Sequence, residues 1–137
     1  MSEANRALME EFIEVVQNPP HDVDAMDRYF APDFVNYDIL PPFPKDLEGS
    51  KELHRRLFRG VPDMRTVVHK MAADGDKIWT YKTCSGTHWG ELLGASATGR
   101  AIAWKVIDIM TIREGRIREH WGVSDIAGVL AQLRGPA

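Results

Sequence analysis

The stretch that decides the fold is DIMTIREGRIREHWGVSD, residues 108–125, where two runs of alternating residues flank Glu114-Gly115. This alternation, rich in β-branched and aromatic residues, predicts a β-hairpin. A two-residue type I′ turn needs a positive φ at both Glu114 and Gly115, whereas a three-residue loop needs it only at Gly115. We therefore expect the three-residue loop.

That loop sets which residues of the two strands face each other. It predicts the pairs Arg113 with Ile117, Met110 with His120, and Asp108 with Gly122. Because side chains alternate along a strand, one face is then predicted to carry Trp104, Val106, Asp108, Met110, Ile112, Arg118, His120 and Gly122. A type I′ turn would instead move His120 to the other face.

Asp108 is the candidate acid/base residue of this face. A carboxyl group on an apolar row is desolvated, which raises its pKa and suits it to proton transfer, although an adjacent imidazolium of His120 would lower the pKa again. Two alternatives stay open at this point. Asp108 can be a structural carboxylate paired to Arg118, Lys105 or a backbone donor, and His120 can be an ordinary buried histidine.

The rest of the chain predicts an α+β fold. Helical spacing covers residues 4–17, 22–30 and 50–61, with Asp22 and Ser50 as caps. Strands are predicted over 64–72, 77–88 and 100–113, followed by the strand after Gly115 and a last helix from Ser124 to Leu133. Helices followed by a four-stranded antiparallel meander place the helices on one face of the sheet. The other face carries Ile107, Ile109, Ile117 and Trp121, which predicts a second subunit over it.

Composition sets the class of protein. A chain of 137 residues with 44% hydrophobic residues fits one globular domain, residues 1–137. A net charge of −3 gives no reason to bind nucleic acid. The charged start MSEANRALMEEF and the lack of an eighteen-residue apolar run lead us to expect a cytoplasmic protein without a membrane partner. Cys84 is the single cysteine and the five histidines are scattered, so we expect no metal.

Several motifs resemble one family, the SnoaL-like polyketide cyclases or ester cyclases of the nuclear transport factor 2-like superfamily. They are APDFVNY, GVPDMRTVV, DGDKIW, SGTHWGELLGASATGR and DIMTIREGRIREHWGVSD, in the family's order. The resemblance implies a cone-shaped α+β barrel with a curved antiparallel sheet, a deep apolar pocket, no cofactor, and a homodimer or tetramer. It also implies aldol ring closure of a polyketide ester, with an acidic residue moving the protons.

One position departs from the family pattern, in which an aspartate directly follows the His-Trp pair. Gly122 stands there in this chain, while the position of Asp108 is a histidine in some members. We therefore expect Asp108 to act as the base, His120 to hydrogen-bond Asp108 or the enolate, and His88 to orient the substrate. The residues expected to line the pocket around a small apolar or aromatic ligand are Phe34, Tyr37, Trp104, Met110 and a space-making Gly122.

Two other functions remain open from the sequence. The same pocket can serve dehydration, isomerisation or hydrolysis, because a fold does not determine its chemistry. Loss of the family carboxylate at Gly122 can also mark a protein that binds a small molecule without converting it.

Overall fold

The computed structural model describes residues 2–135. Its helical elements are α1 (Ser2–Phe12), the π-helical turn η1 (Ile13–Gln17), the 3-10 turn η2 (Val23–Ala25), α2 (Met26–Tyr29), α3 (Leu47–Gly60) and α4 (Ile126–Arg134). Its strands are β1 (Phe30–Asn36), β2 (Arg65–Asp74), β3 (Lys77–Thr87), β4 (Ala101–Arg113) and β5 (Arg116–Ser124).

The strands form one sheet in the order β1-β5-β4-β3-β2. The predicted antiparallel meander is confirmed as β2 to β5. The sequence analysis missed β1, which pairs in parallel with β5 at the sheet edge. Pro32 lies inside β1. Proline has no backbone N–H, and an edge strand tolerates it at a position that faces away from the sheet, where no hydrogen bond to a neighbouring strand is lost. The second predicted helix is correspondingly shorter.

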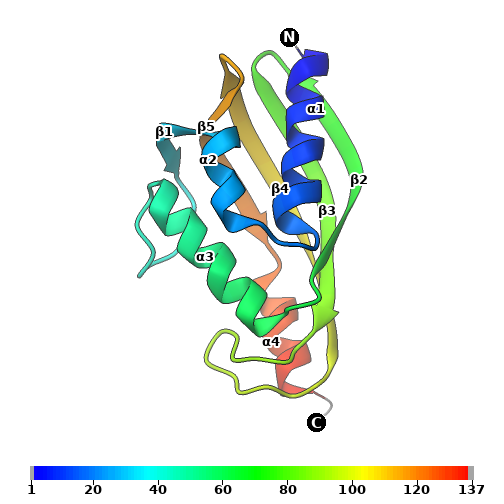
Figure 1. The fold of residues 1–137 in the computed structure, drawn as a ribbon. Helices are drawn as coiled ribbons and strands as arrows, with labels where there is room; N and C mark the ends of the chain where they lie inside the picture. Colours follow the sequence, from blue (N-terminus) through cyan, green and yellow to red (C-terminus); the bar gives the residue numbers. More distant parts are fainter. Residues whose placement is uncertain (1, 136–137) are drawn as a thin grey trace.

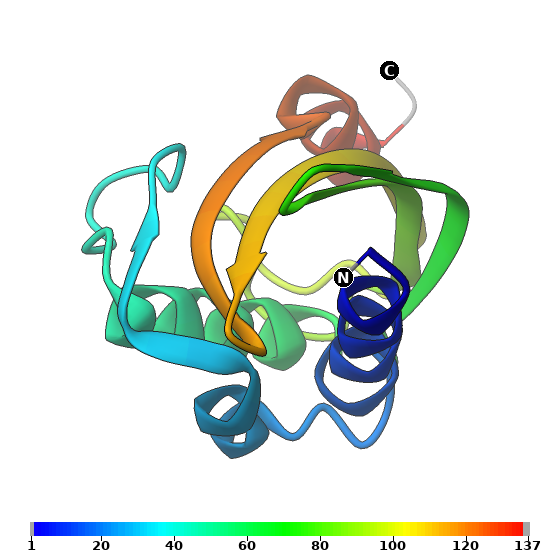
Figure 2. The same cartoon turned by 90° about the horizontal axis from the view of Figure 1, so that it is seen from above.

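The sheet is strongly curved, and α1, α2 and α3 lie on its concave side (Figures 1 and 2). The C-terminal α4 lies at the lower end of β4. There the Gln132 side chain accepts from the backbone N–H of Ala103 at 2.8 Å and donates to its carbonyl at 2.7 Å. This contact caps the part of β4 that extends beyond its pairing with β5.

The concave side holds two apolar clusters with polar residues between them. Members of the upper cluster include Met9, Phe12, Phe30, Phe34, Ile78, Met110, Ile112 and Ile117. The lower cluster contains Val61, Met64, Cys84, Ile102, Trp104, Val106, Val129 and Leu133. Along β3 the buried Thr80 and Lys82 separate Ile78 from Cys84, and along β4 the buried Asp108 separates Met110 from Val106. The polar layer therefore crosses the interior at mid-height.

The hairpin between β4 and β5 differs from the expected one at its turn. Glu114 and Gly115 both have positive φ, 54° and 70°, and Arg113 pairs directly with Arg116. The three-residue loop and the pair of Arg113 with Ile117 are thus wrong. A β-bulge then shifts the register, so that Arg118 is an extra residue of β5.

The bulge restores the pairs on which the site depends. Met110 faces His120 and Asp108 faces Gly122, as predicted. Two placements nearer the turn are wrong, because Ile117 is fully buried in the upper cluster and Arg118 points to Asp33 at 3.5 Å.

Side-chain caps begin three of the helical segments. Asp22 accepts from the backbone N–H of Ala25 at 3.3 Å, as expected. The caps of α3 and α4 are Asp46 and Asp125 rather than Ser50 and Ser124. In both cases an aspartate stands close to the predicted serine and accepts from the N–H three residues ahead.

Candidate active site

Asp108 and His120 form a direct pair on the concave face of the sheet. Nε2 of His120 lies 2.6 Å from Oδ1 of Asp108. The aspartate side chain is 6% exposed and the histidine side chain 18%. The two residues are diagonal neighbours on β4 and β5, so the hairpin register brings them together.

Lys82 on β3 holds the other carboxylate oxygen. Its Nζ lies 2.6 Å from Oδ2 of Asp108, and its side chain is only 2% exposed. Asp108 is thus a paired carboxylate, but its partner is Lys82 rather than Arg118 or Lys105. Its role in proton transfer remains a prediction. One feature of the sequence could have indicated this ion pair. Lys82 alternates with Thr80 and Cys84 on the inward face of β3, and lysine is seldom fully buried without a partner.

The environment of Asp108 lowers its pKa. Burial alone would raise the pKa of this carboxyl group, but the charges of Lys82 and His120, and their hydrogen bonds, hold it well below its usual range. The rise expected from burial is therefore outweighed by the lowering from His120, which was also expected, and from Lys82, which was not. Asp108 is an ionised carboxylate whose two oxygens each accept a short charge-assisted hydrogen bond.

Gln17 extends the cluster toward the helices. Lys82 Nζ donates to Oε1 of Gln17 at 2.8 Å. Gln17 is the last residue of the π-helical turn η1, and the next residue, Asn18, exchanges two hydrogen bonds with the backbone of Thr66 on β2, at 3.2 and 2.8 Å. These bonds fix the end of η1 against the sheet and direct Gln17 into the interior.

His54 on α3 completes the cluster. Its Nδ1 lies 2.7 Å from the carbonyl oxygen of Ser50, and its Nε2 lies 3.3 Å from Nε2 of Gln17. The carbonyl can only accept, so Nδ1 carries the hydrogen and Nε2 accepts from the Gln17 amide. Desolvation by burial, with the nearby charges of Lys82 and His120, lowers the pKa of His54 to about 4, which keeps the ring neutral near pH 7.

This chain of bonds assigns the protons of the site. Gln17 offers its NH2 group to His54 and its oxygen to Lys82, and Lys82 donates to Asp108. The ionised Asp108 can only accept, so Nε2 of His120 carries a hydrogen. In neutral His120 the lone pair is then on Nδ1, the arrangement of a general base that is oriented by a carboxylate.

Gly122 does not open the space that we expected. A Cβ atom built there would lie 2.6 Å from Oδ1 of Asp108 and 2.9 Å from Nε2 of His120. The hydrogen-bonded pair itself therefore occupies the place beside Gly122. A side chain at this position would push the two residues apart.

His88 is not brought together with Asp108 and His120. Its ring is fully buried, and its Nδ1 contacts the hydroxyl of Thr98 at 2.9 Å and the backbone N–H of Thr98 at 3.3 Å. Its backbone bonds to residues 98–100 fix the loop after β3. His88 follows the end of β3, eight residues after Thr80, which pairs with Asp108. Eight residues of extended strand span about 26 Å. Any role of His88 toward substrate remains a prediction.

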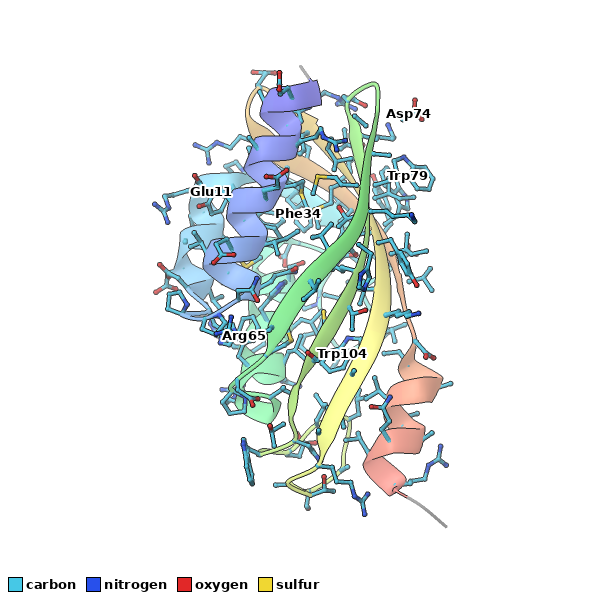
Figure 3. The ribbon with its side chains drawn as sticks, turned by 90° about the vertical axis from the view of Figure 1, so that its right-hand side faces the viewer. Glu11, Phe34, Arg65, Asp74, Trp79 and Trp104 are labelled. Atoms are coloured by element: carbon cyan, nitrogen blue, oxygen red, sulfur yellow. The ribbon has the colours of Figure 1, made fainter. Side chains whose placement is uncertain are left out.

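The predicted pocket residues divide into three locations. Phe34 and Met110 are buried in the upper cluster, and Trp104 is buried in the lower one, on either side of the polar layer. Tyr37 is different, because it is 43% exposed and stacks on Trp121 at 5.0 Å. The prediction that Tyr37 lines the interior is wrong. Figure 3 shows Phe34 on the helix side of the sheet and Trp79 on the opposite side.

Comparison with known proteins identifies the family. The family model described as SnoaL-like polyketide cyclase matches residues 6–133. The chain belongs to this family.

Named relatives agree with the family assignment. The nogalonic acid methyl ester cyclase of Streptomyces nogalater is 26% identical over 122 residues, which cover 82% of this chain and 86% of the relative. TsrD from Streptomyces laurentii superposes with a TM-score of 0.86 at 28% identity, covering 97% of this chain and 96% of its own. A putative polyketide cyclase from Acidithiobacillus ferrooxidans gives 0.84 at 26% identity, covering 100% and 99%.

Within residues 2–135, no three His, Cys, Asp or Glu side chains gather in a way that could hold a metal ion. None of the helices in this part of the chain has the length and apolar character that crossing a membrane requires.

Proposed function

We propose that this SnoaL-like protein is a cofactor-independent acid/base enzyme that removes a proton next to a carbonyl group of a small polyketide-like ester and closes a ring by aldol addition. The observation that carries the proposal is the 2.6 Å contact of His120 with the ionised Asp108 in the polar layer between the two apolar clusters. A buried, oriented imidazole is a suitable base near neutral pH.

In this mechanism the proton acceptor is Nδ1 of His120. The C–H bond next to the carbonyl breaks, the proton goes to Nδ1, and the electron pair forms an enolate. Asp108 holds the ring and stabilises the imidazolium without taking the proton, because its own pKa is held far below neutrality. The enolate carbon then attacks a second carbonyl, and the imidazolium returns its proton to the new alkoxide.

The relatives and the surroundings of the site support this substrate class. The S. nogalater relative is named for nogalonic acid methyl ester. Apolar clusters border the polar layer on both sides, with Trp104 in the lower one, and this favours an apolar substrate. Dehydration, isomerisation or hydrolysis would use the same base, and product analysis by mass spectrometry separates them from ring closure.

The test incubates nogalonic acid methyl ester with the protein in D2O. NMR then monitors two readouts, deuterium uptake by the ester and ring closure. Exchange reports proton removal even when the ring does not close. We expect exchange with the wild-type protein and a loss of roughly 10²–10⁴-fold in His120→Gln. His69→Gln is the matched control, because His69 is an exposed histidine on β2. Equal exchange in His120→Gln and wild type would overturn the proposal.

A second candidate function is binding without conversion. The observation that favours it is Gly122, at the position where the family pattern described above has an aspartate, together with an Asp108 that is ion-paired to Lys82. This function predicts saturable binding of the same ester, detected by calorimetry, with no deuterium uptake and no product. Deuterium uptake that depends on His120 would exclude it.

The proposal includes a second copy of the chain over the convex face of the sheet. Large apolar side chains are exposed there, among them Trp79 at 43%, Ile107 at 46% and Val123 at 73%. An apolar sheet face is costly to leave in water, and a homodimer would cover it.

A further inference from the structure

Lys82 is unusual in its position. It lies on β3 with its side chain 2% exposed, between the buried Thr80 and the buried Cys84. An ammonium group is rarely placed in an interior, because its desolvation is costly unless partners compensate it. Asp108 and Gln17 provide that compensation.

The ammonium group has one more donor than these partners use. A charged lysine carries three N–H groups, and only Asp108 and Gln17 accept from Lys82 in the region that the structure describes. The hydroxyl of Thr80, 1% exposed, has no hydrogen-bond partner within residues 2–135. Buried donors are seldom unpaired, so two such donors on one face need an explanation.

The two donors share one neighbourhood with the proposed base. Thr80 is directly opposite Asp108 in the sheet, and Lys82 follows two residues later on the same face, about 7 Å along the strand. The Asp108 carboxylate lies between them and His120 and accepts from both Lys82 and His120. Because Lys82 and His120 contact the same carboxylate, they are close enough for one small ligand to contact both.

We propose that Lys82, assisted by the Thr80 hydroxyl, donates hydrogen bonds to the enolate oxygen that forms when His120 removes the proton. This inference rests on the proposed function and deepens it, because it makes Lys82 a catalytic residue and specifies the substrate as an enolisable dicarbonyl compound. A fixed ammonium in a site shielded from water stabilises a developing oxyanion strongly. The 2.6 Å contact with Asp108 holds the ammonium group in position for this role.

The test uses benzoylacetone, a neutral aromatic 1,3-diketone whose enolate has its own ultraviolet absorption band. Binding is measured by calorimetry, and the pKa of the bound probe is measured from the enolate band. We expect the wild-type protein to lower that pKa by at least one unit, a tenfold or larger shift toward enolate at pH 7. Lys82→Met is expected to return it to the value in water, and Thr80→Val to weaken the shift. Lys105→Met, an outward lysine of β4, is the control.

Loss of Lys82 leaves Asp108 with His120 as its single ionic partner, which can destabilise the single variant. The double variant Lys82→Met/Asp108→Asn removes both charges of the buried pair and replaces the single variant in the test if that variant unfolds. Wild-type protein that binds the probe without shifting its pKa would overturn the role of Lys82. His120-dependent deuterium exchange would then still support the proposed function. If His120→Gln exchanges as fast as wild type while the pKa shift depends on Lys82, the proposed base falls and the enolate site stands.

Discussion

At the residue scale, Lys82 decides what Asp108 can do. The same carboxyl group on the same apolar row would have a raised pKa if it were alone, because burial penalises its charge. With Nζ of Lys82 and Nε2 of His120 each 2.6 Å away, the balance reverses and the group stays ionised. In the proposed mechanism Asp108 therefore orients His120 and does not transfer a proton itself.

Removing this carboxylate charge should be costly. Asp108→Asn leaves the buried ammonium of Lys82 without its ionic partner, so we expect the free energy of unfolding to fall by about 3–5 kcal/mol. Urea denaturation at pH 7 measures it. Asp33→Asn is the control, because Asp33 makes an exposed pair with Arg118 that should contribute at most about 1 kcal/mol. A loss in Asp108→Asn no larger than in the control would contradict the account.

His54 should make the stability depend on pH in a mildly acidic range. The pKa of His54 in the folded protein is lowered to about 4, below the ordinary value of about 6.5, so the unfolded chain takes up the proton first. The stabilisation is complete above pH 6.5 and is lost as the pH falls toward 4. Between pH 7 and pH 5 we expect the wild type to lose on the order of 1–2 kcal/mol more stability than His54→Gln. The stability of both proteins is measured by urea denaturation at each pH. If the wild type and His54→Gln lose the same stability between pH 7 and pH 5, His54 is not buried as a neutral ring.

At the element scale, the hairpin of β4 and β5 places the pair through two features that oppose each other. The tight turn at Glu114-Gly115 alone would put His120 on the convex face, and the bulge at Arg118 turns it back. The sequence predicts the correct pairs of Asp108 and His120 because one extra residue is present in either arrangement. Whether that residue is in the turn or in the strand depends on packing of Ile117 into the core, which local alternation does not report.

A substitution in the turn between β4 and β5 should stabilise the protein. Glu114 adopts φ 54°, a conformation that favours asparagine or glycine over glutamate, and its contact with Arg118 is long and exposed at 4.0 Å. We expect Glu114→Asn to raise the free energy of unfolding by about 0.5–1 kcal/mol. Thermal and urea unfolding both report it. A destabilised variant would mean that the turn is not the two-residue turn described above.

At the scale of the whole molecule, the concave and convex sides of the sheet have different tasks. The concave side carries the polar layer between two apolar clusters, and the convex side exposes Trp79, Ile107 and Val123. Family, fold class and the central pair of Asp108 and His120 could all be predicted from sequence. The partners of that pair could not.

The reason lies in how those partners reach the site. Lys82 meets Asp108 through the pairing of β3 with β4, which are joined by residues 88–100 rather than by a tight turn, so no turn geometry sets their register. Gln17 and His54 come from helical segments packed on the sheet, and their approach depends on tertiary packing. Strand β1 was hidden for a similar reason, since it pairs with the distant β5.

A homodimer over the convex face should be sensitive to charge placed at its centre. We expect wild-type protein to sediment as a dimer and Ile107→Glu to sediment as a folded monomer, because a buried unpaired carboxylate opposes association. Glu substitution at exposed Leu40, in the loop after β1, is the control and should leave the dimer intact. A wild-type monomer at micromolar concentration in analytical ultracentrifugation would remove the second subunit from the account.

The ionised state of Asp108 is the claim on which the assignment of His120 as base depends. It is tested by an NMR pH titration of the Asp108 carboxyl carbon, with Asp108→Asn identifying the signal. We predict that the carbon chemical shift stays in the carboxylate range from pH 7 down to pH 4, because Lys82 and His120 hold the pKa of Asp108 well below its usual range. Movement of the shift to the carboxylic-acid range above pH 4 would contradict this and would return the role of base to Asp108.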